Sequence, residues 1–440
     1  MPANTALNRL LAAIRGCGIT IRRTNRLLEL LFDPAKTDFA RAAPYLYVLL
    51  NSFEKYFFII IYGVSPCLMP DAADHIRPSR QKSKGFQRRK ACLLCKYQAS
   101  CPGWPRRLEA SSPSFVPDIP GEVVLEVTRR CNLGCRQCSH EKSSLDIPLS
   151  RVKNVIDETV VMGVKTLRLT GGEPLLYPKL KQTLSYAKAK GLYCILNSNL
   201  TLFEKSHEDW IPALVDNILV SMQGHDNASE SRLTGRPSDF NSKLKILVRL
   251  RKKMAVLRLG TVISRTLLEN FRHYVKWMGF IRPDCWELYR PMADPGADPE
   301  FRIRVKDYRD LLACVRQNDQ ESCEIKFSNA IPFCGLKASF EDSRFFLGAR
   351  ADDGHSRLVY DPRGFFKPSY FLNRNLGKNL AKAWSHPFLK KIHSLDYLTG
   401  LCGSCRQAPW CLGGSRFWAK ESRGDFFAKD PLMGRGQQKP

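Results

Sequence analysis

The sequence has 440 residues, with 69 Lys and Arg against 42 Asp and Glu, a formal net charge of +27 and 16 Cys. Its 44% hydrophobic and 25% charged residues exclude a disordered or collagen-like chain, and its length suits two or three domains. No apolar stretch reaches the roughly 18 residues of a membrane span, and Arg15 interrupts the short apolar run at the N-terminus. We therefore expect a cytoplasmic protein without a transmembrane segment, whose Cys bind metal rather than form disulfides.

Residues 1–112 are expected to form a helical N-terminal extension, because Leu7, Leu10, Leu11 and Ile14 recur at helical spacing. Basic residues are only somewhat denser here than in the rest of the chain. This distribution favours a solvated basic surface over a nucleic-acid site. The proline-rich stretch at residues 113–120 predicts a domain boundary.

Residues 113–300 are expected to form the core domain, and from about residue 121 to 292 they alternate between short β-rich runs and helical stretches. Ser150 and Asp239 are expected to cap two of the helices, and Pro178 to open a third. Strands and helices of these lengths predict right-handed βαβ units and a parallel sheet, in an open barrel or a doubly wound fold, with ligands at the carboxyl ends of the strands. The predicted strands are Val123–Val127, Thr166–Leu169, Tyr193–Leu196, Asn217–Ser221, Val256–Ile263 and Trp286–Tyr289.

A first cysteine group, Cys131, Cys135 and Cys138, follows the first predicted strand with C-x3-C-x2-C spacing. Three thiolates on one loop suit three irons of a four-iron cluster and leave the fourth iron open. Zinc would need a fourth protein ligand, which His140 could supply. We favour the iron–sulfur cluster over zinc.

A second motif, Gly171-Gly172-Glu173-Pro174, ends the next predicted strand. The two glycines allow the backbone to approach a ligand closely, and the Glu173 carboxylate can accept a hydrogen bond from an ammonium group. By itself this motif is an ordinary turn. One strand after the cysteine loop, at the same edge of the sheet, it predicts a ligand site that the two motifs share.

Together the two motifs resemble the signature of the radical S-adenosylmethionine (radical SAM) superfamily, over roughly residues 121–292. The resemblance implies an α/β fold with a partial (β/α)6 barrel. It also implies that the three cysteines hold a [4Fe-4S] cluster whose open iron binds S-adenosylmethionine, and that Gly171, Gly172 and Glu173 hold the methionine amino group. Further cofactor-binding residues implied by the resemblance are Pro174, Asn197, Ser198 and Ser221.

The implied chemistry belongs to the cofactors. One electron from the cluster would cleave the sulfonium and give a 5′-deoxyadenosyl radical that abstracts hydrogen from the substrate. The electron would come from an external donor of the flavodoxin or ferredoxin type. Gln137 stands where the family usually has an aromatic residue beside the adenine, which weakens that one contact. No residue of this chain is assigned a catalytic role.

Residues 301–440 lose the strand–helix alternation and are expected to form a smaller, irregular iron–sulfur domain. Cys402, Cys405 and Cys411, with C-x2-C-x5-C spacing, resemble the auxiliary-cluster domain called SPASM, found in peptide and sulfatase maturases. We expect one auxiliary cluster to be retained and a second to be lost; the alternative is a vestigial domain with zinc or no metal. Cysteine is missing at three positions where that domain usually has it: Ser369, Ser415 and Met433.

The N-terminal extension repeats the C-x2-C-x5-C spacing at Cys92, Cys95 and Cys101. The repeat predicts a further metal site, either separate from the C-terminal one or completing it. The cysteines without a partner at metal spacing are expected to be buried apolar residues: Cys17, Cys67, Cys194 and Cys285.

Three functional hypotheses follow. The favoured one is a radical SAM maturase that acts on a peptide or a peptide-derived precursor. The second keeps the chemistry but takes a small-molecule substrate, such as a tetrapyrrole or a lipid-linked compound. The third, of another class, is a non-catalytic iron–sulfur or zinc protein.

Overall fold

The computed structural model describes residues 119–433, apart from 139–140, 293–297, 319–322, 340, 350–351, 401, 403–404 and 406–407. It also describes most of residues 2–65 and short pieces at 76–77, 86–87, 101 and 103–105. Cys67, Cys92, Cys95 and His140 lie outside the described residues. The chain divides into an N-terminal unit, Met1–Phe115 with Thr399–Pro409, and a core unit, Val116–Leu398 with Trp410–Pro440.

The N-terminal unit begins with the predicted helix, α1 (Pro2–Arg15), and continues into a sheet that the sequence analysis did not anticipate. The sheet has the order β1-β2-β3-β4, with β1 antiparallel to β2 and the other pairs parallel. Leu7, Leu11 and Ile14 of α1 are buried in one cluster with Leu28 and Leu30 of β2. The strands are β1 (Ile19–Thr24), β2 (Leu27–Phe32), β3 (Phe58–Tyr62) and β4 (Ile76–Arg77), with β5 (Phe86–Gln87) and β6 (Trp104–Pro105) as a separate antiparallel pair.

The core unit is built on a sheet of nine strands among the described residues, in the order β13-β12-β11-β10-β9-β8-β7-β14-β15. All six predicted strands are present as β7 to β12, and each pair of neighbours is parallel. The strands are β7 (Glu122–Thr128), β8 (Thr166–Gly171), β9 (Tyr193–Ser198), β10 (Asn217–Ser221), β11 (Val256–Val262), β12 (Cys285–Tyr289), β13 (Glu324–Ser328), β14 (Arg357–Asp361) and β15 (Phe365–Lys367).

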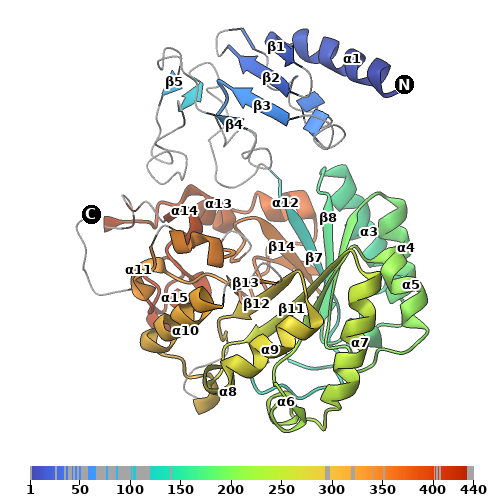
Figure 1. Ribbon diagram of the computed structural model, residues 1–440, viewed down its shortest axis with the longest axis vertical. Helices are drawn as coiled ribbons and strands as arrows, with labels where there is room; N and C mark the ends of the chain where they lie inside the picture. The colour runs from blue at the N-terminus through green and yellow to red at the C-terminus, as the bar shows by residue number, and fades with distance from the viewer. Residues whose placement is uncertain are drawn as a thin grey trace. The chain divides into compact units, whose positions relative to one another are not determined.

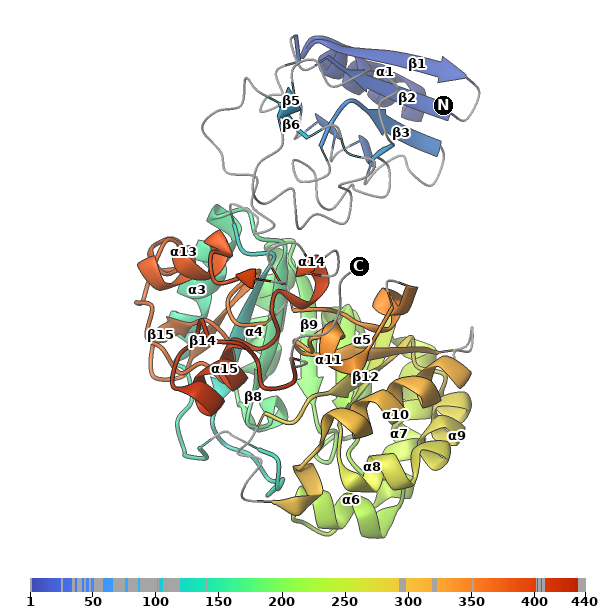
Figure 2. The same cartoon turned by 90° about the vertical axis from the view of Figure 1, so that its left-hand side faces the viewer.

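The predicted boundary at residue 300 implied that residues 301–440 form a domain separate from this sheet. Strands of that segment instead belong to the sheet. β13 pairs in parallel with β12, and β14 pairs in parallel with β7 at the other end of the row. Figure 2 shows β14 and β15, in orange, beside the strands of the core. The alternation of strand and helix ends near residue 300, but the hydrogen-bonded sheet does not.

Helices cover the outer face of the curved sheet (Figure 1). Asp239 caps α7 as predicted, because its side chain accepts a hydrogen bond from Ser242 N. The predicted Ser150 cap is wrong: α3 already begins at Leu149, after Pro148, and Ser150 lies inside it. The α-helices of the core unit are α3 (Leu149–Val161), α4 (Leu180–Ala189), α5 (His207–Leu214), α6 (Asn227–Thr234), α7 (Phe240–Lys253), α8 (Arg265–Glu269), α9 (Phe271–Ile281), α10 (Val305–Gln317), α11 (Phe333–Leu336), α12 (Leu380–Trp384), α13 (Pro387–Ser394) and α15 (Arg416–Arg423), while α14 (Ala408–Cys411) crosses the boundary between the units.

Pro178, predicted to open a helix, lies two residues before α4. Short 3-10 helices complete the unit: η4 (Pro174–Leu176), η5 (Pro299–Phe301) and η6 (Glu341–Phe345). None of the helices in the described part of the chain is both long and apolar enough to cross a membrane.

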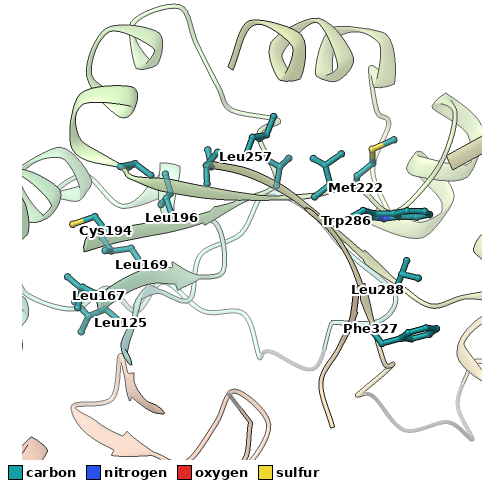
Figure 3. Packing of buried hydrophobic residues seen from close by; sticks show 14 of the residues in the cluster. Leu125, Leu167, Leu169, Cys194, Leu196, Met222, Leu257, Trp286, Leu288 and Phe327 are labelled. Carbon is teal, nitrogen blue, oxygen red and sulfur yellow. The ribbon is translucent and has the colours of Figure 1, made fainter. Parts of the chain in front are cut away.

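The strands separate an apolar face from a polar one. Alternate residues such as Leu125, Leu167 and Leu196 are buried in the cluster between the sheet and the helices (Figure 3). Because successive side chains of a strand point to opposite faces, the residues between them face the inside of the curved sheet. Arg168 and Asn197 are of this second kind. The helix side of the sheet is therefore the hydrophobic core, and the other side holds the polar groups.

A buried ion pair ties the C-terminal segment to the sheet. The guanidinium of Arg290, which follows β12, donates to both carboxylate oxygens of Asp430 at 2.6 and 3.0 Å. Asp430 also accepts from the backbone N–H groups of Ser415 and Leu432. The Arg290 and Asp430 side chains are 4% and 0% exposed. One carboxylate thus joins the segment after β12 to two segments of the C-terminal region.

We predict that Asp430→Ala destabilises the protein by about 3 kcal/mol or more, because it leaves the Arg290 guanidinium buried without a counter-charge. Denaturant unfolding of the core unit's far-UV signal measures the loss. Glu421→Ala, which changes an exposed acidic residue of α15, is the control and should change stability by less than about 0.5 kcal/mol. Equal stability of the two variants would contradict the role given to this pair.

Candidate active site

The carboxyl ends of β7 to β12 surround one pocket of about 510 Å³ in the core unit. Parallel strands bring their carboxyl ends to the same edge of a sheet, so loops that are far apart in the sequence meet there. Cys131, Glu173, Asn199, Gln223 and Tyr289 line this pocket from five such ends or loops. The expected position of a ligand site is therefore where the structure has this pocket.

The three cysteines of the first group all line the pocket from the loop after β7. Cys131 and Cys135 are partly buried and Cys138 is exposed. Burial raises the pKa of Cys135 to about 12, and the nearby Cys138 and Cys131 add to the shift. In the described part of the chain no three Cys, His, Asp or Glu side chains already have metal-binding geometry. The cluster site thus stays a prediction, supported by three neighbouring thiols on one loop.

Hydrogen bonds at both ends fix this cysteine loop. Arg130 donates to the two carboxylate oxygens of Asp146 at 3.0 and 2.7 Å and also to the Leu176 carbonyl. Further along, Gly134 N donates to Thr234 O at 2.7 Å. The loop is therefore held to the segment before α3, to the segment after β8 and to the end of α6.

Gly171 and Gly172 bring the end of β8 against the cysteine loop. A Cβ atom on Gly171, whose φ is +142°, would lie 2.3 Å from Thr128 O, and one on Gly172 would lie 2.1 Å from Arg130 O. Real Cβ atoms do not come this close, so only glycine fits. Both residues line the pocket. The close approach that requires glycine, however, is to the backbone of Thr128 and Arg130 and not to a ligand.

Glu173 is a buried carboxylate that joins the ends of β8 and β9. Its Oε1 accepts from Leu175 N at 3.1 Å and from Ser198 Oγ at 2.7 Å, and its Oε2 accepts from Asn199 N at 2.8 Å. The side chain is only 1% exposed, and this burial raises its pKa against the effect of the hydrogen bonds. A carboxylate has about four acceptor positions, so one is left for a ligand donor such as an ammonium group.

The other cofactor residues predicted from the sequence divide into two groups. Asn197, Ser198 and Ser221 line the pocket, but Asn197 accepts from Arg168 and Ser198 is bonded to Glu173. Pro174 is buried at the start of η4 and is not among the lining residues. Gln137 lines the pocket next to Cys138, and its Oε1 has no hydrogen-bond partner in the protein.

Sequence reasoning missed the charged groups on the inner face of the sheet. Arg168 donates to both oxygens of Glu122 at 2.7 and 2.9 Å, and Arg357 of β14 donates to Glu122 Oε1 at 3.3 Å. Burial alone would raise the pKa of Glu122, but these guanidinium groups lower it to about 2. Arg258 pairs with Glu287 across β11 and β12. The sequence does contain a signal for these charged groups, because a charged residue inside an apolar strand is unusual, as in TLRLT and VLRLG.

Cys411, the member of the other cysteine groups that belongs to the described core unit, is not among the residues that line this pocket. Cys402 and Cys405 belong to the N-terminal unit, as does Cys101, whereas Cys411 belongs to the core unit. Of the lone cysteines, Cys17, Cys194 and Cys285 are buried as expected. Metal binding by the two C-x2-C-x5-C groups stays a prediction.

Two serines at expected cysteine positions are hydrogen-bonded in the core unit. Ser369 Oγ accepts from Leu372 N at 3.2 Å, and Ser415 Oγ accepts from Trp418 N at 3.3 Å, which caps α15. Both serines are buried, at 3% and 1% exposure. They stabilise local backbone turns here.

The sequence of residues 125–278 matches the family profile described as the radical SAM superfamily. The matched residues include β8 to β11 and the cysteine loop. The chain therefore contains a radical SAM domain. Members of the superfamily that match this chain are enzymes, so the non-catalytic hypothesis is set aside. The radical SAM domain implies a [4Fe-4S] cluster and S-adenosylmethionine as cofactors.

Curated relatives of this radical SAM enzyme have two kinds of name. An AdoMet-dependent heme synthase of Nitratidesulfovibrio vulgaris is 24% identical, over 74% of this chain and 94% of that protein. A PqqA peptide cyclase of Granulibacter bethesdensis is 28% identical, over 71% of this chain and 86% of that protein.

Solved structures share the fold of the enzyme. Streptococcus suis SuiB bound to the precursor peptide SuiA has a TM-score of 0.58 and 16% identity, over 72% of this chain and 76% of that one. Native anSMEcpe with bound AdoMet has a TM-score of 0.57 and 14% identity, over 71% of this chain and 93% of that one. At these identities the comparison establishes the fold alone.

The pocket suits the two implied cofactors in its donor set. Three neighbouring thiols match the three protein ligands of a cluster with one open iron. Glu173, with one acceptor position free, and Gln137, with an unpartnered Oε1, line the same pocket as these thiols. Both are acceptors that could receive N–H donors of S-adenosylmethionine.

We predict that Gly172→Ala lowers affinity for S-adenosylmethionine at least about tenfold, since the added methyl group must separate the β8 end from the cysteine loop. Equilibrium binding to the anaerobically reconstituted enzyme measures the change. Gly279→Ala on the exposed face of α9, where a Cβ meets nothing within 4 Å, should bind as wild type does. Unchanged binding by Gly172→Ala would contradict the packing role of this glycine.

Proposed function

We propose that this enzyme cleaves S-adenosylmethionine reductively and abstracts a hydrogen atom from a peptide or a peptide-derived precursor. The observation that carries the proposal is a single pocket lined by two sets of residues. The first set is the cysteine loop with Glu173 and Asn199. The second set consists of charged and polar residues from β11 to the segment after β15. The first set suits the cofactors and the second suits a polar substrate.

When bound, the cluster and S-adenosylmethionine supply a 5′-deoxyadenosyl radical through one-electron cleavage of the sulfonium. The chain's own residues hold and orient these two cofactors. Cys131, Cys135 and Cys138 ligate three irons, and the glycine pair keeps their loop against β8. Glu173 accepts from the methionine ammonium while its other hydrogen bonds fix the ends of β8 and β9. The electron comes from an external donor of the flavodoxin or ferredoxin type.

The peptide substrate is supported by the names of similar proteins. PqqA peptide cyclases are among the curated relatives, and SuiB has been solved with a precursor peptide. The heme synthases among the relatives support the second candidate, a small-molecule substrate of the tetrapyrrole kind. A short peptide encoded beside the gene, and modified by the purified enzyme, would separate the two.

We further propose that Cys402, Cys405 and Cys411 hold one auxiliary cluster and that a second is absent. Its absence is supported by Ser369 and Ser415, which are buried and hydrogen-bonded within the protein. Cys92, Cys95 and Cys101 are proposed to bind a further metal or to complete the C-terminal site.

We predict that Cys131→Ala abolishes 5′-deoxyadenosine formation from S-adenosylmethionine with dithionite as the reductant, because it removes one of the three cluster ligands. Chromatographic measurement of 5′-deoxyadenosine in anaerobic single-turnover reactions checks this. Cys194→Ala, in the apolar core between β9 and the helices, should keep the activity. If Cys131→Ala forms as much product as wild type, the proposed function is wrong.

A further inference from the structure

Buried polar atoms without a hydrogen-bond partner gather at the pocket. In folded proteins almost all buried polar groups are hydrogen-bonded, and an exception calls for an explanation such as a missing ligand. Five of the seven exceptions among the described residues belong to side chains that line the pocket. These five are Gln137 Oε1, Arg258 Nη2, Asn329 Oδ1, Asp352 Oδ2 and Tyr370 OH, whereas Thr183 and Tyr360 lie elsewhere.

Four of these atoms belong to segments other than the cysteine loop. Arg258 is on β11, Asn329 follows β13, Asp352 precedes β14 and Tyr370 follows β15. Asn329 and Asp352 are each only 8% exposed. None of the four residues belongs to the motifs that predict cofactor binding. We call Arg258, Asn329, Asp352 and Tyr370 the far-wall group.

The far-wall group combines donors and acceptors. Arg258 uses Nε to donate to Asn217 at 2.8 Å and Nη1 to donate to Glu287, so only Nη2 is left to bind a ligand. Asp352 Oδ1 accepts from Asn329 Nδ2 at 3.4 Å and lies 3.5 Å from Arg357 Nη2, which leaves Oδ2. A ligand that satisfies the group must carry both an oxygen acceptor and N–H donors.

The charge of the pocket favours an anionic acceptor. Its lining includes six basic side chains and four acidic ones. Arg168 and Arg357 share the carboxylate of Glu122, and Arg357 also pairs with Asp352. The Arg357 guanidinium also lies over the Tyr370 ring, 5.5 Å from its centre. A carboxylate bound by Arg258 and Tyr370 would add negative charge to a lining that carries more basic than acidic side chains. The lining acidic residues are Glu173, Glu230, Glu287 and Asp352.

We propose that the far-wall group is a substrate subsite for an acidic residue of a peptide. Its side-chain carboxylate accepts hydrogen bonds from Arg258 Nη2 and Tyr370 OH. The neighbouring peptide N–H groups donate to Asp352 Oδ2 and Asn329 Oδ1. This inference rests on the proposed function and adds the chemical class of the substrate group that the pocket recognises.

Removal of a hydroxyl group that has no partner in the protein should not destabilise it. We predict that Tyr370→Phe melts at or above the wild-type temperature but binds the substrate group about tenfold more weakly. Tyr360→Phe is the matched control, because its hydroxyl is also buried and unpartnered but lies outside the pocket. Tyr360→Phe should also melt at or above the wild-type temperature, and it should bind the substrate group as tightly as wild type does.

The probes are N-acetyl-glutamate methylamide, its glutamine analogue, and glutarate, which has a carboxylate but no amide. Ligand-observed NMR titration of the reconstituted enzyme with S-adenosylmethionine measures binding. We expect the glutamate probe to bind at least about tenfold more tightly than either other probe. Arg258→Lys, which keeps a cation beside Glu287 but loses the forked donor, should reduce this preference.

Three results would overturn the inference: no binding of the glutamate probe, equal binding of the glutamine probe, or Tyr370→Phe indistinguishable from Tyr360→Phe. Binding of glutarate as tight as that of the glutamate probe would overturn the assignment of peptide N–H donors and indicate a small-molecule carboxylate instead. The assay needs no cleavage of S-adenosylmethionine. Its outcome is therefore separate from that of the Cys131→Ala experiment, which tests the proposed function.

Discussion

The parallel register of β7 to β12 is the constraint on which the site depends. It places the carboxyl ends of six strands around one pocket, although the residues there span more than 150 positions of the sequence. The buried Glu173 carboxylate then links two neighbouring ends, since it accepts from Ser198 and from Asn199 N. Glycine at 172 allows the cysteine loop to pack against the same strand end. Backbone pairing thus determines where the cofactor-binding residues lie, and the buried Glu173 carboxylate fixes the ends of β8 and β9 relative to each other.

The inner face of the sheet gives the pocket further charged residues. β8, β11 and β14 each carry an arginine on the inner face, Arg168, Arg258 and Arg357, and apolar residues on the face that packs on the core. Most of these ions are neutralised within the protein, as Glu122 is by Arg168 and Arg357. Three of the pocket's five atoms that lack partners, those of Asn329, Asp352 and Tyr370, belong to the segments after β13. We therefore interpret the C-terminal segment as the part of the core unit that recognises the substrate.

The sequence predicted the features that depend on local spacing. The cysteine motif, the glycine pair and the six strands of residues 121–292 are recognisable because their residues lie close together along the chain. The pairing of β14 with β7 was not predictable in this way, since it joins residues more than 200 positions apart. The N-terminal sheet was missed because the helical pattern around Leu7 was extended to the whole segment. The Ser150 cap failed because Pro148, with its fixed φ, begins the helix earlier.

The most direct test of the central claim is electron paramagnetic resonance of the anaerobic, reduced enzyme before and after addition of S-adenosylmethionine. Our account predicts a reduced four-iron signal whose shape changes with the nucleotide, because one iron is left open by the three thiols of the cysteine loop. That signal should vanish when Cys131, Cys135 and Cys138 are all replaced by alanine, even if signals from other clusters persist. A protein that contains zinc and no iron, or a spectrum that the nucleotide leaves unchanged, would contradict the account.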